Sequence, residues 1–303
     1  MSKISILQNF RSSLLQREPF TYFSIDRALP DSLYEELSRT YPSIETIFDY
    51  CFRKNDKEMV QNTRYQLSCA EVYEMPDLLI GAWRDFVYYH SSQEFLDEVL
   101  DKLGDSIHAT YPALAAAMER KAPGGKPRAG VRRHGDTAGE CELALDCQIG
   151  INSPVTVEGS SVIGPHLDNP KELYAGLFYL RHPEDVASGG DLIVYEWKDR
   201  QNRGFVEKRY IDPSLVVERG SIPYGPNRFV WFLNTVEAVH GVTIRQRSPQ
   251  PRRLCNIIAE VYPTVPTLFD VSALQTKTSL FQKVGKLLGS SLFQMESRKF
   301  RAT

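Results

Sequence analysis

The chain has 303 residues, of which 42% are hydrophobic and 24% are charged, so it is long enough to form one large domain or two small ones. A formal net charge of −2 excludes the overall positive field expected of a protein that binds nucleic acid along its surface. The five cysteines show no CxxC spacing, which argues against a disulfide framework or a zinc knuckle and favours a reducing compartment.

The N-terminal segment has no continuous apolar core and no small-residue cleavage site, and it therefore lacks the features of a signal peptide. No apolar run elsewhere approaches the length that spans a bilayer. We therefore expect a cytoplasmic protein with no integral membrane segment.

Helical patterns dominate the first part of the chain. Residues 20–25 favour a short strand, and residues 31–41 carry apolar side chains at four-residue spacing, which is typical of an amphipathic helix. A second helical pattern runs over residues 76–104. Residues 43–72 are mixed and polar and predict no particular element. A break rich in Gly and Pro follows at residues 121–127.

Strands dominate the second part of the chain. Short apolar stretches with turn residues between them replace the helical spacing. The predicted strands cover residues 141–157, 175–181, 191–197, 205–211, 228–233 and 254–262. Helices first and many short strands afterwards predict an α+β fold whose second half is a sandwich or a barrel.

We expect one domain over residues 1–262, with a helical lead-in over residues 1–125 and the strand-rich core over about residues 126–262. Residues 263–303 form a C-terminal extension in which apolar side chains recur at helical spacing among basic residues. Packing of this C-terminal helix on the domain, or a homodimer contact through it, is favoured over binding to a membrane surface.

The most informative stretch lies just past the midpoint and reads Gly-Pro-His-Leu-Asp-Asn-Pro over residues 164–170. In an extended strand, His166 and Asp168 project to the same side. An imidazole beside a carboxylate supplies two of the three ligands of a two-His-one-carboxylate iron site. His240, within Val-His-Gly-Val, is the candidate for the third ligand.

The His-x-Asp pattern alone is weak, because the chain holds competing copies. His134 precedes Asp136 by the same spacing, and His182 precedes Glu184. The stretch around His134 is typical of a solvated turn, and His182 begins a polar loop after a strand. His166 precedes an ordered run of strands and lies 74 residues before His240, which is enough chain to cross a sheet and return.

From His166 to Tyr262 the chain resembles the catalytic core of the iron(II)- and 2-oxoglutarate-dependent oxygenases, in the branch of the prolyl 4-hydroxylases. The resemblance rests on the order of several motifs over about a third of the chain. After His166-x-Asp168 these are Leu177-Phe-Tyr-Leu180, Gly189-Gly-Asp-Leu192, Asn227-Arg-Phe-Val-Trp-Phe-Leu233 and Val239-His-Gly-Val242, followed by a basic residue that opens the last core strand.

This resemblance implies a double-stranded β-helix, or jelly roll, of the cupin type, with N-terminal flanking helices. It implies Fe(II) as the metal, held by His166, Asp168 and His240, with 2-oxoglutarate as cosubstrate and O2 as oxidant. The implied reaction releases succinate and CO2 and oxidises an unactivated C–H bond of the substrate. The residue types of the three ligands agree with this implication.

The far carboxylate of 2-oxoglutarate needs a buried cation, and the family places an arginine on the strand after the distal histidine. Arg253 and its neighbour Arg252 both match, but on a strand only one of them can face the site. We expect Arg253 to face it. Tyr179 and Gln148 lie on strands expected to line the roll and are further candidates for binding the cosubstrate.

The nature of the substrate is open. A small molecule is the favoured substrate, and the basic stretch Lys126–Arg133 suggests that it carries negative charge, although a solvated strand edge explains the same pattern. A protein hydroxylase of the prolyl type and a non-catalytic, cupin-like metal-binding module are the alternatives.

Overall fold

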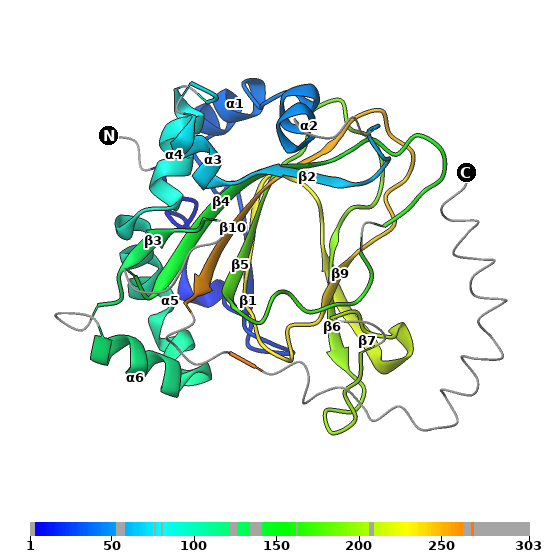
Figure 1. Cartoon of the computed structure of the whole chain (residues 1–303). Coiled ribbons are helices and arrows are strands. Elements are labelled where there is room, and N and C mark those ends of the chain that lie inside the picture. The colour runs from blue at the N-terminus through cyan, green and yellow to red at the C-terminus, as the bar shows by residue number, and fades with distance from the viewer. Residues whose placement is uncertain are drawn as a thin grey trace.

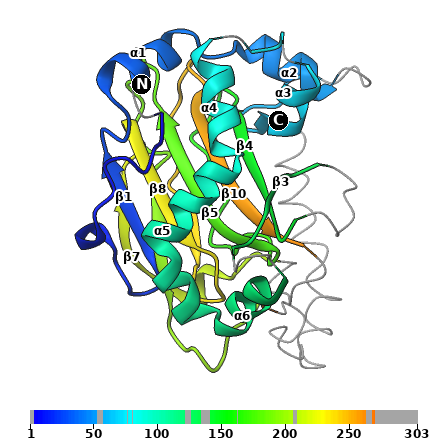
Figure 2. The same cartoon turned by 90° about the vertical axis from the view of Figure 1, so that its left-hand side faces the viewer.

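The computed structural model describes residues 4–52, 58–75, 77–79, 81–121, 126–133, 141–161, 163–205, 209–262 and 268–269. In this part of the chain a layer of helices, a large sheet and a small sheet lie one behind another (Figures 1 and 2). The predicted C-terminal helix of residues 271–303 and the competing His134–Asp136 pair lie outside the described residues.

The helices come mainly from the N-terminal part of the chain. They are the short 3-10 turn η1 (Ser12–Leu14), α1 (Asp31–Arg39), α2 (Ile44–Phe52), α3 (Cys69–Glu74), α4 (Ala82–His90), α5 (Gln93–Thr110), α6 (Pro112–Lys121) and a second 3-10 turn, η3 (Pro213–Leu215). None of the helices in the described ranges is long and apolar enough to span a bilayer.

The strands form two sheets. They are β1 (Tyr22–Asp26), β2 (Arg64–Leu67), β3 (Ala129–Val131), β4 (Leu143–Asn152), β5 (Glu172–Leu180), β6 (Leu192–Trp197), β7 (Val216–Ile222), β8 (Pro226–Leu233), β9 (His240–Val242) and β10 (Arg252–Val261). The large sheet has the order β1-β8-β5-β10-β4-β2, with β3 paired to β4, and the small sheet has the order β7-β6-β9. Every pairing is antiparallel except that of β3 with β4.

The two faces of the large sheet pack against different layers. On β10, the side chains of Cys255 and Ile257 belong to the main core cluster, which contains the apolar faces of the helices. Leu254 and Ile258 point the other way and pack with residues of the small sheet. This alternation follows from the two-residue period of a strand. The position of a residue on β10 therefore decides whether its side chain faces the helices or the space between the sheets.

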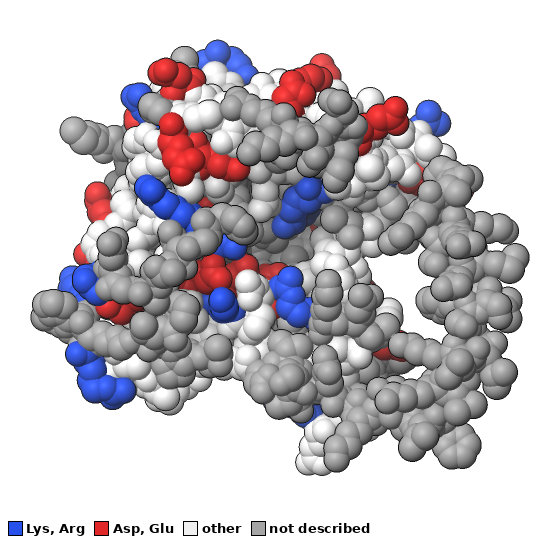
Figure 3. All heavy atoms as spheres, in the orientation of Figure 1, with Lys and Arg blue, Asp and Glu red and all other residues white. Residues whose placement is uncertain are grey.

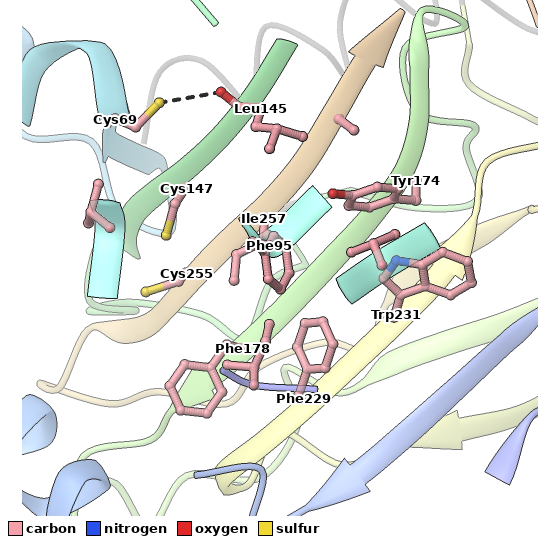
Figure 4. Packing of buried hydrophobic residues seen from close by; sticks show 14 of the residues in the cluster. Cys69, Phe95, Leu145, Cys147, Tyr174, Phe178, Phe229, Trp231, Cys255 and Ile257 are labelled. Atoms are coloured by element: carbon pink, nitrogen blue, oxygen red, sulfur yellow. Dashed lines mark hydrogen bonds between the residues drawn. The ribbon is translucent and has the colours of Figure 1, made fainter. Parts of the chain in front are cut away.

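Aromatic side chains fill the layer between the large sheet and the helices. Figure 4 shows Phe178, Phe229 and Trp231 from neighbouring strands side by side, with Phe95 of α5 packed over the same sheet. All four are at most 1% exposed. The described cysteines, namely Cys69, Cys141, Cys147 and Cys255, are free and buried.

The predicted α+β character is confirmed, and the arrangement of strands is consistent with a jelly roll. The helical pattern of residues 76–104 belongs to two helices rather than one. α4 ends at His90, and Ser92 caps α5 by accepting a hydrogen bond from the backbone N–H of Phe95. No strand forms in the described part of residues 205–211, where Tyr210 makes only an isolated bridge to His166. The strands β2, β3, β7 and β9 were not predicted from the sequence.

A buried histidine in the helix layer gives the fold a pH dependence. His90 is fully buried, its Nδ1 lies 2.8 Å from the carbonyl oxygen of Phe86, and its Nε2 accepts a hydrogen bond from the backbone N–H of Ile6. Burial lowers the pKa of His90 to about 3. Because the unfolded chain takes up this proton near pH 6.5 and the folded chain does not, stability is complete above that pH and falls as the pH decreases.

We expect the free energy of unfolding to decrease below pH 6.5 by up to about 1.4 kcal/mol per pH unit for each buried neutral histidine. The substitution His90→Gln should make this pH dependence smaller, because it removes a group that is protonated in the unfolded chain and neutral in the folded one. Urea unfolding curves of wild type and His90→Gln between pH 7 and pH 5 measure the difference. Equal slopes in wild type and His90→Gln would show that His90 is charged in the folded protein.

Candidate metal centre

Backbone pairing brings His166 and His240 together across 74 residues of chain. The N–H of His166 donates to the carbonyl oxygen of His240 over 2.9 Å, and the N–H of His240 donates back over 3.1 Å. His240 opens β9, which pairs with β6 so that His240 lies opposite Val194. The position of each histidine is therefore fixed by main-chain hydrogen bonds at the edge of the small sheet.

His166, Asp168 and His240 form the group of possible metal ligands found in the described part of the chain. The Nε2 atom of His166 lies 3.7 Å from Oδ1 of Asp168, and the Nε2 atom of His240 lies 3.6 Å from Oδ2. One ligand atom from each residue lies within 4.8 Å of the other two. Three such atoms can converge on a single ion at bonding distances of about 2 Å with small side-chain movements.

The two imidazole rings are oriented by carbonyl groups of their own segments. Nδ1 of His166 lies 2.8 Å from the carbonyl oxygen of Gly164, and Nδ1 of His240 lies 2.9 Å from that of Ala238. A carbonyl oxygen only accepts, so each Nδ1 carries the proton and donates it. Each Nε2 is then left with a free lone pair directed at Asp168, which is the arrangement in which imidazoles bind metals.

The electrostatic environment keeps the three groups in the state that binds a metal. Burial and, to a smaller extent, the neighbouring His166 lower the pKa of His240 to about 4. Burial acts to raise the pKa of Asp168, but His240, His166 and Arg209 together hold it well below its usual range. At neutral pH the site therefore consists of a neutral His240 and an ionised carboxylate, and no proton has to leave these two before a cation binds.

This donor set suits a particular class of metal ion. Two imidazoles and one carboxylate on one side of an ion match the facial arrangement of non-heme Fe(II) sites, which leave further coordination positions open. Sulfur ligands, which favour zinc structural sites and iron–sulfur clusters, are absent from the group.

Arg253 does not face the candidate metal centre, and the expectation that it does was wrong. Its Nε donates to the carbonyl oxygen of Leu180 over 3.0 Å, and its two terminal nitrogens donate to the backbone oxygen and the hydroxyl of Ser38. Ser38 belongs to α1, on the helix side of the large sheet. Arg253 therefore lines a groove outside the space between the sheets, with Tyr41 and Arg181.

Arg252 points into the space between the sheets. It is 2% exposed, and its guanidinium carbon lies 4.9 Å from the ring centres of both Tyr179 and Tyr224. Its Nε donates to the carbonyl oxygen of Gly190 over 3.0 Å, and its Nη1 lies 3.4 Å from Oδ1 of Asn152. Its buried Nη2 has no hydrogen-bond partner among the described residues. A buried guanidinium with an unused donor is suited to an anion.

The turn before β6 explains how Arg252 is held. Gly189 and Gly190 both have positive φ, at 82° and 83°, a conformation that glycine adopts without strain. A Cβ atom at Gly189 would lie 1.9 Å from the backbone oxygen of Ile244, and one at Gly190 would lie 3.2 Å from Nε of Arg252. The two glycines therefore let the turn approach closely and present the Gly190 carbonyl to Arg252.

Tyr179 and Gln148 both lie on strands of the large sheet, and their polar groups are used differently. The hydroxyl of Tyr179 is buried and has no hydrogen-bond partner in the described ranges. The side-chain amide of Gln148 donates to Asp146 over 2.8 Å and accepts from Asn256 over 3.0 Å. Tyr179 thus has a free group beside Arg252, whereas Gln148 is engaged at both ends.

The competing histidine His182 lies away from the candidate metal centre. His182 lines the same outer groove as Arg253, and its Nδ1 accepts a hydrogen bond from the backbone of Glu184. The sequence analysis missed Asn152 and Arg64, which join Arg252 in one row across the large sheet. Arg64 lies in the polar stretch for which the sequence predicted no element, and only its pairing with β4 reveals its position.

In comparisons with known proteins, the chain is similar to several solved structures at low sequence identity. No family model and no curated protein matches the chain. A prolyl 4-hydroxylase from Phytophthora capsici is 14% identical with a TM-score of 0.39, over 88% of this chain and 67% of that one. The epimerase SnoN, solved with Fe3+ and alpha-ketoglutarate, is 11% identical with a TM-score of 0.40, over 85% and 86%. A dioxygenase for auxin oxidation in rice is 11% identical with a TM-score of 0.42, over 89% and 86%.

The geometry of the site predicts which substitutions affect metal binding. Asp168→Ala and His240→Ala should each abolish binding of one Fe(II) or Co(II) ion per chain, because each removes one of three ligands. His182→Ala should bind the metal like the wild type, because His182 lies in the outer groove. Anaerobic calorimetry and metal analysis after desalting measure both.

His134→Ala provides the second control, since this histidine belongs to the competing His-x-Asp pattern. It should retain the metal, and His166→Ala should lose it. The reverse result would show that the metal is held by the pair at residues 134 and 136.

Proposed function

We propose that the protein is an iron(II)- and 2-oxoglutarate-dependent dioxygenase that hydroxylates or otherwise oxidises an unactivated C–H bond of a small molecule and releases succinate and CO2. One observation carries this proposal, namely that the His166–Asp168–His240 group and the unsatisfied guanidinium of Arg252 belong to the same space between the sheets. In this proposal the two sheets are the two sides of a double-stranded β-helix.

His166, Asp168 and His240 are the residues that would hold the iron. The two imidazole rings and the ionised carboxylate of Asp168 supply the donor atoms and the negative charge that Fe(II) accepts. Iron, 2-oxoglutarate and O2 together supply the oxidising power for the C–H bond, which no side chain possesses. The carbonyl groups of Gly164 and Ala238 keep both rings in the binding orientation, so the protein needs little reorganisation when the metal enters.

Arg252 is the residue that would hold the far carboxylate of 2-oxoglutarate. Its Nη2 and the hydroxyl of Tyr179 are buried donors without partners in the described ranges, which is costly unless a ligand accepts from them. A planar guanidinium that is fixed by Gly190 and Asn152 can bind a carboxylate through two parallel hydrogen bonds. Arg252 replaces Arg253 as the proposed anchor.

The spacing along β6 supports a diacid that bridges the two groups. Gly190, which holds Arg252, precedes Val194 by four residues, and Val194 pairs with His240. Only the end of the glycine turn and the first residues of β6 separate the point that holds Arg252 from the point that holds His240. In this proposal a five-carbon diacid bridges the two, with one end on the metal and the other on Arg252.

Anaerobic titration with 2-oxoglutarate tests the anchor. The Fe(II)-loaded wild type should develop the weak visible charge-transfer band that is expected when 2-oxoglutarate binds to such iron sites. In Arg252→Gln the dissociation constant for 2-oxoglutarate should rise roughly ten- to hundredfold, because one or two charge-assisted hydrogen bonds worth about 1.5–3 kcal/mol are lost.

Arg253→Gln is the matched control, since it removes the same charge from the neighbouring position on the other face of β10. It should leave the affinity for 2-oxoglutarate unchanged. A larger effect of Arg253→Gln than of Arg252→Gln would refute the assignment of Arg252. A wild-type protein that binds iron without developing the band would refute the dioxygenase proposal itself.

A further inference from the structure

Arg64 lies beside Arg252 on the face of the large sheet that looks toward the small sheet. In the antiparallel register, Arg64 of β2 is opposite Asn152 of β4, and Asn152 is in turn opposite Arg252 of β10. Directly opposed residues of antiparallel strands project to the same face, with Cβ atoms about 4.5–5.5 Å apart. Two guanidiniums and one amide therefore form a row at this end of the sheet.

The guanidinium of Arg64 has no hydrogen bond or ion pair to another side chain within the described part of the chain. The residue is exposed to solvent, yet burial is the main cause that lowers its pKa, followed by the charge of Arg252. A side chain that contacts solvent while protein surrounds it lines an opening rather than a convex surface. Asp168 and Tyr179 are among the groups that act on its charge, so this opening is that of the candidate site.

Other basic residues near the space between the sheets are already paired. Arg132 binds Asp146 and Glu260, and Arg128 binds Glu142 over 2.9 Å. The basic stretch that the sequence analysis related to a negatively charged substrate is therefore neutralised by its own carboxylates where it is described. Figure 3 shows acidic and basic side chains close together near the centre of the face toward the viewer, over the space between the two sheets.

Arg209 is another cation close to the metal ligands, and the carboxylate of Asp168 offsets its charge. Burial acts to raise the pKa of Asp168, and Arg209 is among the charged groups that lower it. Arg64 differs because Arg252, in the same row of the large sheet, acts on its pKa more strongly than any carboxyl group does. Like charges placed side by side are unfavourable unless an anion joins them.

We propose that Arg64 binds an anionic group, a carboxylate or a phosphate, of the primary substrate and so holds the substrate beside the metal. This inference rests on the proposed function, in which Arg252 is occupied by 2-oxoglutarate. Arg252 is 2% exposed, whereas Arg64 reaches solvent, so the buried guanidinium suits the cosubstrate and the accessible one suits a molecule that enters afterwards. Arg64 is thereby a specificity-determining residue that selects anionic molecules.

The test uses the full chain loaded with Ni(II) and saturating 2-oxoglutarate, so that the site of Arg252 is filled. Inorganic phosphate and acetate are titrated separately by calorimetry as the two anion probes. At least one of them should bind the wild type. Arg64→Gln should weaken that binding at least tenfold, and Arg64→Lys should restore part of it because the charge returns without the planar fork. The stronger of the two probes identifies the class of anion.

Arg84→Gln is the charge-matched control, because Arg84 is exposed on α4, on the far side of the large sheet. It should leave anion binding within twofold of the wild type. The melting temperature of Arg64→Gln should stay at or above that of the wild type, since no described salt bridge is lost and one like-charge contact is removed. A marked loss of stability would show a structural role for Arg64 and overturn the proposal.

The charge-transfer titration distinguishes the ways in which the proposal can fail. In Fe(II)-loaded Arg64→Gln, the affinity for 2-oxoglutarate should stay within about twofold of the wild type, in contrast to Arg252→Gln. Equal losses in the two variants would assign Arg64 to the cosubstrate and refute its role toward the substrate. A normal band combined with absent or unchanged anion binding would refute this inference alone. No band in the wild type would refute the proposed function on which it rests.

Discussion

The candidate site depends on the reciprocal backbone pairing of His166 with His240. These two hydrogen bonds, at 2.9 and 3.1 Å, hold together segments that are 74 residues apart, and each ring is then turned by a carbonyl of its own segment. The ligand geometry is therefore produced by the main chain and requires no attraction between the side chains themselves. A site of this kind is preorganised, and burial of a neutral imidazole is the cost, since the pKa of His240 falls to about 4.

The two faces of the large sheet differ in role: one packs against the helices, and the other lines the space that holds the candidate site. Two adjacent arginines on β10 demonstrate the difference. On the helix side, Arg253 donates to Leu180 and Ser38 with all three of its nitrogens, so its burial is compensated within the protein. On the other side, Arg252 retains a buried donor without a described partner. An unsatisfied buried donor costs about 1–3 kcal/mol, and a bound anion would remove that cost.

The sequence predicted a residue's position where its spacing allows a single arrangement, and it failed where two neighbouring residues fit equally well. The spacing of His166 and Asp168 requires only that the segment is extended, and the structure brings both close to His240. Choosing between Arg252 and Arg253 requires knowing which residues of β10 face the helices and which face the small sheet. Because this strand is buried on both faces, its sequence does not alternate between apolar and polar residues, and the orientation could not be predicted. Arg64 could not be placed because β2 has only four residues and derives its position from pairing with β4.

The charges on the inner face of the large sheet are unequally distributed along β10. At its start, Arg252 and Arg64 lie in one row with the neutral Asn152 between them. Near its end, about 20 Å further along the strand, Arg132 is shared by Asp146 and Glu260. One end thus has an excess of cations and the other an excess of carboxylates. A diacid and a second anion bound at the cationic end would offset the repulsion between the two arginines.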